Sequence, residues 1–475
     1  MAPRQRNPTF VLADEGPVNT TPTSSSASPS DDHNDDNATV STRSVKLSDL
    51  GDTEVCIDGL IYDLTSFDHP GGDSIFMFGG NDTTEMYRMI HPHHKPGQNE
   101  QLAKLRVVGK VDDYVAEYKW DTEFEREVKQ EVFKIVRRGR EFGTFGWYAR
   151  AIVYISVFLY LQVLWMKSTS IPLAIAYGVS MALIGLNVQH DANHGAASRK
   201  VWVNDLLGLG ADMIGGSKWL WMQKHWTHHA YTNHHEKDPD GFAAEPFVLF
   251  NPPTDESGQR HAYHAYQAFY LVAVLSGYWV SAILDFPMIW KLQDGGAVKV
   301  GMRLDNSWVN SRRVYALTLR AFYLFCNIVV PMYRNFSWST AGHIWLMGAA
   351  GSLALGCLFT LSHNFEDADR DPTLKTRETG EPTDWFKAQV ETSSTYGGFI
   401  SGWLTGGLNF QVEHHLFPRM SSSWYPYIAP KIREISKKHD VRYAYYPWVW
   451  NNMWSTLVYT HQVGNGGVGS KTKTQ

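Results

Sequence analysis

The segment AIVYISVFLYLQVLWM, residues 151–166, carries no charged side chain and is followed by the short polar stretch Lys167-Ser-Thr-Ser170. A second uncharged segment runs from Ile171 to Val188. A helix needs about 20 predominantly apolar residues to cross a bilayer, and each segment approaches that length with the aromatic residues that flank it. Because so short a stretch joins them, the sequence predicts a helical hairpin that crosses a membrane twice.

A second pair of apolar segments, Tyr315 to Tyr333 and Ile344 to Leu361, predicts a second membrane hairpin. Basic residues gather at the outer ends of both hairpins, whereas each connecting turn holds a single one, Lys167 or Arg334. Cytosolic loops are enriched in Lys and Arg, so both turns are predicted to be luminal and the rest of the chain, including the N-terminus, cytosolic. The basic residues that support this orientation are Arg137, Arg138, Arg140, Arg150, Arg199, Lys200, Arg312 and Arg313.

The composition of the 475-residue chain excludes some classes of protein. Its 43 Lys and Arg residues are outnumbered by 48 Asp and Glu, so the chain lacks the basic footprint of a nucleic-acid-binding protein. The three cysteines, Cys56, Cys326 and Cys357, share no close spacing, which excludes a disulfide scaffold and a thiolate zinc site. The 20 histidines point instead to imidazole chemistry in a reducing compartment.

Changes in composition along the chain predict a multi-domain protein with five segments. Residues 45–112 have the alternating pattern of a small mixed α/β domain, with strands expected around 55–57, 61–64 and 105–111. The charged run from Thr122 to Arg140 predicts a helix. The five segments are a disordered tail over 1–44, the α/β domain over 45–112, a linker with an amphipathic helix over 113–144, an all-α membrane domain over 145–450 and a tail over 451–475.

Three short clusters carry the histidine chemistry of the membrane domain. They are HDANH at 190–194, HWTHH at 225–229 and QVEHH at 411–415. Residues three and four apart share one face of a helix, so the imidazoles of each cluster are predicted to converge. Each cluster alone is a weak signal that a solvated helix face would explain. Polar residues near membrane depth are costly, so three clusters beside the predicted spans favour a metal site.

The segment from Ala265 to Leu284 is also uncharged and long enough to cross a membrane. A single crossing there would put the third histidine cluster on the opposite face from the first two. We therefore interpret this segment as an interfacial or half-inserted helix and predict four transmembrane helices, because an even number of crossings lets the clusters meet. Two shorter apolar stretches, Leu206 to Gly216 and Gly397 to Leu408, are also predicted to lie at the interface.

A site built from imidazoles with few carboxylates suits iron that accepts electrons and binds oxygen. The box histidines are too many for one ion and match two, provided that further ligands exist. They are His190, His194, His225, His228, His229, His414 and His415. His363, at the cytosolic end of the fourth predicted span, is the best additional candidate, although a helix-end histidine bonded to the backbone is an equal alternative. His234 and His235 are weaker candidates because a solvated loop explains them.

The α/β domain contains the stretch HPGG at residues 69–72, which resembles the haem-binding motif of the cytochrome b5 family. The proline fixes the turn, and the two glycines let the backbone approach the ring closely. Haem iron held from both faces needs a second histidine, and GNDTTEMYRMIH at 80–91 resembles the second half of the motif. We therefore predict haem b, with His93 and His94 as open alternatives for the second ligand. The residues assigned to the haem are His69, Pro70, Gly71, Gly72 and His91.

Residues 145–450 resemble the membrane fatty-acid desaturases, which carry three histidine boxes of this kind. The third box begins with Gln411, as in the front-end class, which inserts a double bond between an existing one and the carboxyl end of the chain. The family implies a catalytic non-haem diiron centre on the box histidines, and whether Gln411 contacts metal stays open. The segments KWLWMQKHWTHH and FPRMSSSWYPYIAPKIREI are most similar to microalgal, diatom-type delta-5 enzymes.

The resemblance implies an O2-dependent oxidoreductase of polyunsaturated fatty acid biosynthesis in the endoplasmic reticulum membrane. Its acyl substrate is linked to phospholipid or CoA, and its electrons come from NADH–cytochrome b5 reductase through the fused haem domain. No Gly-rich nucleotide-binding fingerprint follows a predicted strand, so the reductase is predicted to be a separate protein. The alternatives are delta-6, delta-8 or delta-4 desaturation, a haem-fused acyl or sphingoid-base hydroxylase, and a membrane-anchored haem electron carrier.

Overall fold

A tight turn at Asp58 and Gly59 sets the first hairpin of the N-terminal sheet. Both residues have left-handed backbone angles, φ 52° and φ 79°, as a two-residue hairpin turn requires. The turn joins β2 (Glu54–Ile57) to β3 (Leu60–Asp63), which pair antiparallel, and β4 (Arg106–Val111) pairs with the other edge of β3. The three strands predicted from the alternating sequence pattern are therefore confirmed.

The computed structural model describes residues 43–93, 102–252, 259–284, 286–291 and 305–467. All of them belong to one compact unit that begins at Val40. The predicted tail, as far as residue 42, and the alternative haem ligand His94 lie outside the described residues.

The sheet has the strand order β1-β4-β3-β2, with β1 (Ser44–Val45) parallel to β4 at one edge. Two helical segments follow β3 in the sequence, η2 (Asp73–Phe78) and α1 (Thr84–Ile90). The HPGG stretch leads directly into η2, and His91 ends α1 with its backbone N–H donated to the carbonyl of Tyr87. Both halves of the predicted haem motif are thus anchored on helical segments of this module. Two short helical turns, η1 (Leu47–Asp49) and η3 (Leu102–Lys104), complete it.

The linker helix α2 (Glu123–Ile135) starts where the sequence predicts it, at Thr122, whose hydroxyl accepts a hydrogen bond from a backbone N–H of the first turn. It ends before the predicted end at Arg140, because the backbone leaves helical geometry at Val136, with φ −107° and ψ 95°. The buried face of α2 packs against α19 (Tyr425–Lys438). The linker is therefore part of the packed unit rather than an extended tether.

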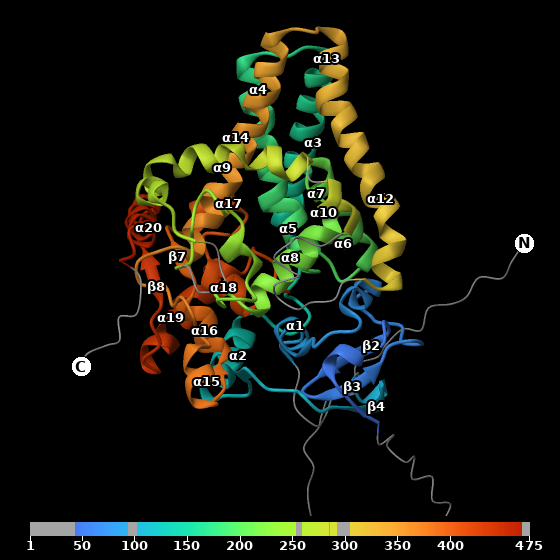
Figure 1. Cartoon of the computed structure of the whole chain (residues 1–475), viewed down its shortest axis with the longest axis vertical. Coiled ribbons are helices and arrows are strands. Elements are labelled where there is room, and N and C mark those ends of the chain that lie inside the picture. Colours follow the sequence, from blue (N-terminus) through green and yellow to red (C-terminus); the bar gives the residue numbers. More distant parts are fainter. Residues whose placement is uncertain (1–42, 94–101, 253–258, 285, 292–304, 468–475) are drawn as a thin grey trace, which may run out of the picture. The chain divides into compact units, whose positions relative to one another are not determined.

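Two helical hairpins form an apolar bundle, and their helices run side by side in Figure 1. The helices are α3 (Phe145–Lys167) and α4 (Ile171–Ile184) in the first hairpin, and α12 (Ser307–Leu324), α13 (Val330–Arg334) and α14 (Trp338–His363) in the second. A π-helical segment continues α4, η4 (Gly185–Gln189), and another joins α12 to α13, η7 (Phe325–Val329). Both predicted helical hairpins are confirmed.

The backbones of α4 and α14, one helix from each hairpin, approach each other closely at two glycines. A Cβ atom on Gly178 of α4 would lie 2.2 Å from the carbonyl oxygen of Met347 on α14, and one on Gly351 would lie 2.9 Å from the carbonyl oxygen of Gly178. Such contacts allow only a hydrogen atom at each position. Small residues that let two backbones come together are typical of helix pairs in membranes, where burial of apolar side chains gives no driving force for association.

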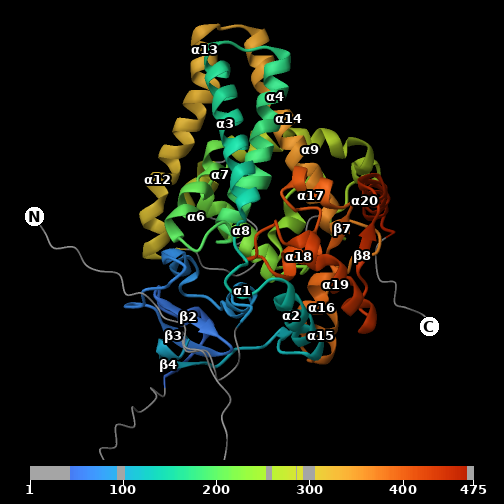
Figure 2. The same ribbon diagram turned by 180° about the vertical axis from the view of Figure 1, so that it is seen from behind.

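Five helical stretches of the described chain are long and apolar enough to cross a membrane, including 262–284, which contains η6 (Ala262–Tyr266) and α9 (Gln267–Leu284). The other four belong to the two hairpins. In both views α9 runs across α14 rather than alongside it (Figures 1 and 2). A Cβ atom on Gly348 of α14 would lie 2.1 Å from the Trp279 ring, so α9 is seated against the bundle.

The two shorter apolar stretches that the sequence places at the interface fold into short helices. These are α6 (Val201–Gly208) and α7 (Gly210–Met213) in one stretch and α17 (Phe399–Thr405) in the other. They leave large apolar side chains exposed, for example Ile400, which is 78% exposed. Exposed apolar side chains on short helices fit a location at a bilayer surface.

The remaining elements surround the lower end of the bundle as drawn in Figure 1. They are α5 (His190–Asn193), α8 (Lys218–Ala230), η5 (Pro239–Phe242), α10 (Phe286–Lys291), α15 (Leu374–Thr379), α16 (Trp385–Glu391), α18 (Gln411–Leu416) and α20 (Val449–Gly464), with the paired strands β5 (Tyr118–Lys119) and β6 (Thr383–Asp384), and β7 (Ser394–Tyr396) and β8 (Ala444–Tyr446). Helix α20 begins two residues before the stretch predicted as a C-terminal tail, and the rest of it lies in that stretch. It buries Tyr459 and Val463 and packs against α9, so residues 451–464 belong to the packed unit.

Candidate metal centres

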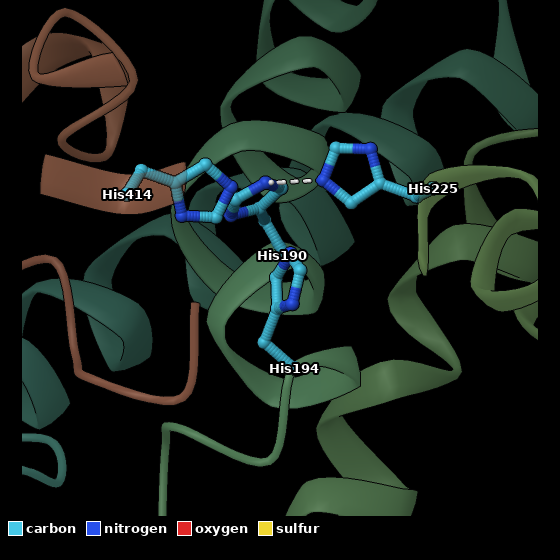
Figure 3. A group of neighbouring side chains, drawn as sticks. All are labelled: His190, His194, His225 and His414. Carbon is cyan, nitrogen blue, oxygen red and sulfur yellow. Dashed lines mark hydrogen bonds between the residues drawn. The ribbon is translucent and has the colours of Figure 1, made fainter. Parts of the chain in front are cut away.

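The first group of histidines joins four side chains from three separate parts of the chain. His190 and His194 come from the end of the first hairpin, His225 from α8 and His414 from α18, and all four are buried. One ring nitrogen from each lies within 4.8 Å of those of the other three. The Nε2 atoms of His190 and His225 are 3.1 Å apart (Figure 3). This group brings members of all three predicted clusters together.

The second group consists of His228, His363 and His415, which are also buried and also within 4.8 Å of one another by one ring nitrogen each. The Nε2 atoms of His228 and His363 are 3.3 Å apart. His363 ends the last helix of the second hairpin and is the additional candidate that the sequence indicates. The structure therefore places it beside two box histidines.

The HWTHH cluster divides between the two groups, which differs from the convergence expected from its spacing. His225 belongs to the first group and His228 to the second. His229 lies between them, with its Nε2 atom 3.1 Å from that of His225 and its ring stacked at 4.0 Å on the ring of His415. Residues on one helix face can therefore serve two neighbouring centres when partners approach from both sides.

The type of helix changes just before the first histidine cluster, from π-helix to α-helix. The π-helical segment 185–189 gives way to α5, which begins at His190. Wide π-helical turns occur frequently at functional sites because they re-aim the side chains that follow. This segment could not be predicted, because a π-helical turn of five residues, GLNVQ, is too short to show a period different from that of the α-helix around it.

Asp238 holds the imidazole of His228. A carboxylate oxygen lies 2.9 Å from the Nδ1 atom of His228, and Asp238 is only 1% exposed. The other carboxylate oxygen accepts from the backbone N–H of Asn233, which fixes its orientation. Burial alone would lower the pKa of His228, but Asp238 and the nearby Asp240 outweigh it and raise the pKa to about 9. A carboxylate in this position orients a metal-binding imidazole and increases its basicity.

Three further histidines also bond through Nδ1, so that the other ring nitrogen remains available to a metal. The pairs are His415 with the side-chain oxygen of Gln389 at 2.8 Å, His414 with the hydroxyl of Tyr425 at 3.1 Å, and His363 with the carbonyl of Thr392 at 3.1 Å. Sequence reasoning missed these partners and Asp238. The partners of His415, His414 and His363 lie outside the histidine clusters, and no periodicity marks them.

The donor set fits iron. The Nε2 atoms of His194 and His414 are buried and have no hydrogen-bond partner among the described residues, as expected of nitrogens that face a metal. Burial and neighbouring imidazoles keep the pKa well below its usual range for the histidines outside the apolar helices, which favours the neutral, metal-binding form. These are His194, His225, His229, His414 and His415.

The Gln411 side chain points into the second group. Its amide nitrogen lies 3.1 Å from the Nε2 atoms of both His363 and His415, and its amide oxygen is buried without a partner among the described residues. A half-turn of the amide exchanges the two atoms and brings the oxygen, which can bind a metal, to the same place. His234 and His235 belong to neither group and stack on each other at 5.0 Å.

The two predicted haem ligands, His69 and His91, also lie close to each other. The rings of His69 and His91 are 6.1 Å apart, and each Nδ1 atom is bonded to a carbonyl oxygen, Gly72 at 3.1 Å and Tyr87 at 2.7 Å. With each Nδ1 atom directed at a carbonyl oxygen, Nε2 is the atom that each ring would offer to an iron between the rings, which fits a haem held from both faces. His93 lies elsewhere, with its ring 4.2 Å from that of Phe133.

The two glycines of the HPGG stretch have separate roles. A Cβ atom on Gly71 would lie 2.6 Å from Cε1 of His69, so this glycine leaves room for the imidazole itself. Gly72 has a left-handed φ of 94°, and a Cβ atom there would lie 2.8 Å from Val201 on α6. Pro70 is exposed at the turn. The second glycine is therefore needed for the contact with the helical part of the chain.

Comparison with protein families assigns both parts of the chain. Residues 167–447 match the family described as fatty acid desaturase, which covers more than half of the sequence. The chain belongs to the fatty acid desaturase family. Residues 42–112 of this desaturase match the cytochrome b5-like haem/steroid binding domain. The predicted resemblance of both parts is thereby confirmed, and the histidine groups lie within the matched desaturase region.

Several relatives align with most of the desaturase. It is 32% identical over 412 residues to the acyl-lipid (7-3)-desaturase of Rebecca salina, which covers 85% of this chain and 89% of that protein. It is 27% identical over 452 residues to the acyl-lipid (8-3)-desaturase B of Dictyostelium discoideum, covering 88% and 93%. It is 26% identical over 436 residues to the Delta(5) fatty acid desaturase A of the same organism, covering 87% and 91%.

Proposed function

We propose that this desaturase is a front-end enzyme that introduces the delta-5 double bond into polyunsaturated acyl chains carried on membrane lipid. The observation that carries the proposal is the pair of buried histidine groups in the same chain as the His69–His91 pair. Gln411 at the head of the third box supports the front-end class. Relatives named acyl-lipid (8-3)- and Delta(5) desaturases support the lipid carrier and this position, whereas two relatives at 32% identity are named acyl-lipid (7-3)-desaturases and support the lipid carrier alone.

The two histidine groups would hold one iron ion each. His190, His194, His225 and His414 form one ligand set, and His228, His363 and His415, with Gln411 beside them, form the other. His229 touches both sets and completes the centre. When bound, the irons supply the oxygen activation that an unactivated methylene pair requires. For each double bond, the two hydrogens that the acyl chain loses, together with O2, two electrons and two protons, give two molecules of water.

The chain's own residues keep the centre dry and rigid. Every histidine of the two groups is less than 10% exposed, and the Nδ1 contacts to Asp238, Gln389, Tyr425 and Thr392 fix four of the rings. A fixed, water-excluded site protects reactive species from side reactions. The apolar faces of the bundle bring the acyl chain to this site from the bilayer.

We assign four transmembrane helices, with α9 at the interface and both hairpin turns in the lumen of the endoplasmic reticulum. The crossing of α9 over α14 supports this count, because a fifth span would separate the elements that meet at the histidine groups. The same topology puts the domain over 45–112 and the centre in the cytosol, where NADH–cytochrome b5 reductase would deliver electrons to haem b.

Expression in a yeast that lacks polyunsaturated lipids tests the proposal. Cells are fed fatty acids that differ in the position of their first double bond, and mass spectrometry locates the new double bond and the lipid pool in which it first forms. A delta-5 product that forms first in phospholipid is expected. A bond at delta-4, delta-6 or delta-8, or a hydroxylated product, would overturn the assignment. The His228→Ala variant serves as the inactive control.

A further inference from the structure

The haem module and the histidine centre meet through two helices that each carry ligands. Helix α1, which ends at His91, packs against α8, which carries His225, His228 and His229. The hydroxyl of Tyr231, just after α8, donates a hydrogen bond of 3.1 Å to the buried carboxylate of Glu85 on α1. The contact is therefore specific as well as close.

Apolar residues of the haem module continue into the core of the desaturase. Phe78, Met86 and Met89 are each less than 5% exposed and belong to the same buried cluster as Leu220 and Met222 of α8. A continuous core fixes the separation and orientation of the two modules. Delivery of electrons in this chain then depends on what lies in the contact, rather than on the reach of a flexible tether.

One aromatic pair bridges the contact next to the metal ligands. The ring of Trp226 stacks on that of Phe78, with centroids 6.1 Å apart and planes inclined by 21°. Phe78 ends the segment that begins with the HPGG stretch, and Trp226 is bonded through one peptide unit to His225 of the first histidine group. Its indole N–H is buried without a partner among the described residues, so no hydrogen bond explains this side chain.

We propose that Trp226, stacked on Phe78, is the relay through which electrons pass from the haem module to the non-haem centre. This inference rests on the proposed function, because it requires both redox groups. Each transfer moves one electron, which oxidises the haem iron by one and reduces the non-haem centre by one. No proton or leaving group is involved at the relay. Two transfers supply the electrons for one double bond.

A second aromatic route exists in the structure and supplies a competing hypothesis. The ring of His93 lies 4.2 Å from that of Phe133 on α2, and Phe133 makes an edge contact at 5.7 Å with Phe417, two residues after His415. This route has one more aromatic step and leaves from His93, which is not paired with His69. The stack of Phe78 on Trp226 needs a single ring-to-ring step and ends at the residue next to His225.

The rate of haem oxidation in the full-length, metal-loaded protein tests the relay. The haem is reduced without oxygen, the protein is mixed with substrate and O2, and the haem absorbance is followed by stopped flow. For Trp226→Leu the rate of haem oxidation is expected to fall to about one tenth of the wild-type rate or lower. Trp226→Phe keeps an aromatic ring and is expected to retain most of the rate. Trp219→Leu, on the same helix but against Tyr315, is the matched control and should keep the wild-type rate.

A second readout separates electron delivery from damage to the site. When both centres are reduced chemically in advance, Trp226→Leu should give the wild-type yield of product in a single turnover, with unchanged iron and haem content. If that variant loses iron, Phe78→Leu replaces it, because Phe78 adjoins no non-haem ligand, and the same slowing is expected. A wild-type rate in Phe78→Leu, or slowing in Phe133→Leu alone, would overturn the relay. An error in the proposed reaction would appear instead in the wild-type product.

Discussion

The Nδ1 atom of His228 lies 2.9 Å from a carboxylate oxygen of Asp238, and both side chains are buried. The imidazole thus has one nitrogen fixed by a charge and the other directed at His363. A carboxylate that backs a metal-binding histidine fixes the ring and strengthens it as a ligand. The second histidine group therefore depends on a residue ten positions away in the sequence, outside the box itself.

Replacement of Asp238 by Asn should weaken iron binding without removing a ligand. Loss of such a partner lowers metal affinity by about 10- to 100-fold in other proteins. The ratio of non-haem iron to haem is measured after dialysis against a series of chelator concentrations. Asp238→Asn should lose its iron at a lower chelator concentration than wild type. Asp240→Asn is the control, since Asp240 is 43% exposed and 3.7 Å from the same nitrogen, and should have a smaller effect. Equal chelator sensitivity of the two variants would contradict this role for Asp238.

His363→Ala should lose most of the second iron and nearly all desaturation while retaining the haem. This imidazole faces those of His228 and His415, and its removal leaves that group with two histidines. Metal analysis together with the haem spectrum gives the measurement. His343→Ala is a matched control on the same helix, because His343 lies near the hairpin turn and contacts Thr169 at 2.9 Å. Full iron content in His363→Ala would show that this histidine only caps the helix.

Much of this arrangement could be predicted from the sequence because it follows from local patterns. The apolar runs gave both hairpins, and the position of His363 at the end of a predicted helix identified it as an additional candidate. The division of His225 and His228 between two groups could not be predicted, because it depends on partners that approach α8 from different sides. The contact between Gly72 and Val201 could not be predicted either, because it depends on the tertiary structure. The motif alone predicts only that this glycine lets the backbone approach the haem.

Gly71→Ala should abolish or greatly reduce haem binding, although it adds a single methyl group. The new Cβ atom would lie 2.6 Å from Cε1 of His69, so the imidazole must leave its position. The Soret absorbance per protein should fall toward that of His69→Ala, while non-haem iron is retained. Gly51→Ala, in the same module, meets only the flexible carboxylate of Glu54 at 3.3 Å and should keep its haem. A normal haem spectrum in Gly71→Ala would require that the His69 ring binds in another orientation.

The topology of α9 can be measured with single cysteines in a cysteine-free background. Positions 263 and 290 flank α9 and are exposed, and we expect both to react with a membrane-impermeant reagent in sealed microsomes. Position 338, at the start of α14, is 94% exposed and should react only after the membrane is opened. Labelling of positions 263 and 290 from opposite sides would mean that α9 crosses the membrane and that five spans are present.

The buried carboxyl group of Glu85 should make the stability of the protein depend on pH. Burial, followed by the charge of Asp82, raises the pKa of Glu85 from 4.5 to about 8, against the opposing charge of Lys237. The folded protein therefore keeps a proton that the unfolded chain releases near pH 4.5. The stability that this proton confers is complete below that pH and is lost as the pH rises toward about 8.

Thermal unfolding of the full-length protein across this pH range provides the measurement. Wild type should lose stability relative to Glu85→Gln as the pH rises from 5 to 8, by a few kcal/mol in total, and the difference should then stay constant. Glu85→Gln keeps a polar side chain at the contact and cannot ionise, so it isolates the proton from the packing. Tyr231→Phe removes the hydrogen bond and should retain the pH dependence, because burial is the main cause of the raised pKa. Parallel curves for wild type and Glu85→Gln would show that this carboxyl group is ionised in the folded protein.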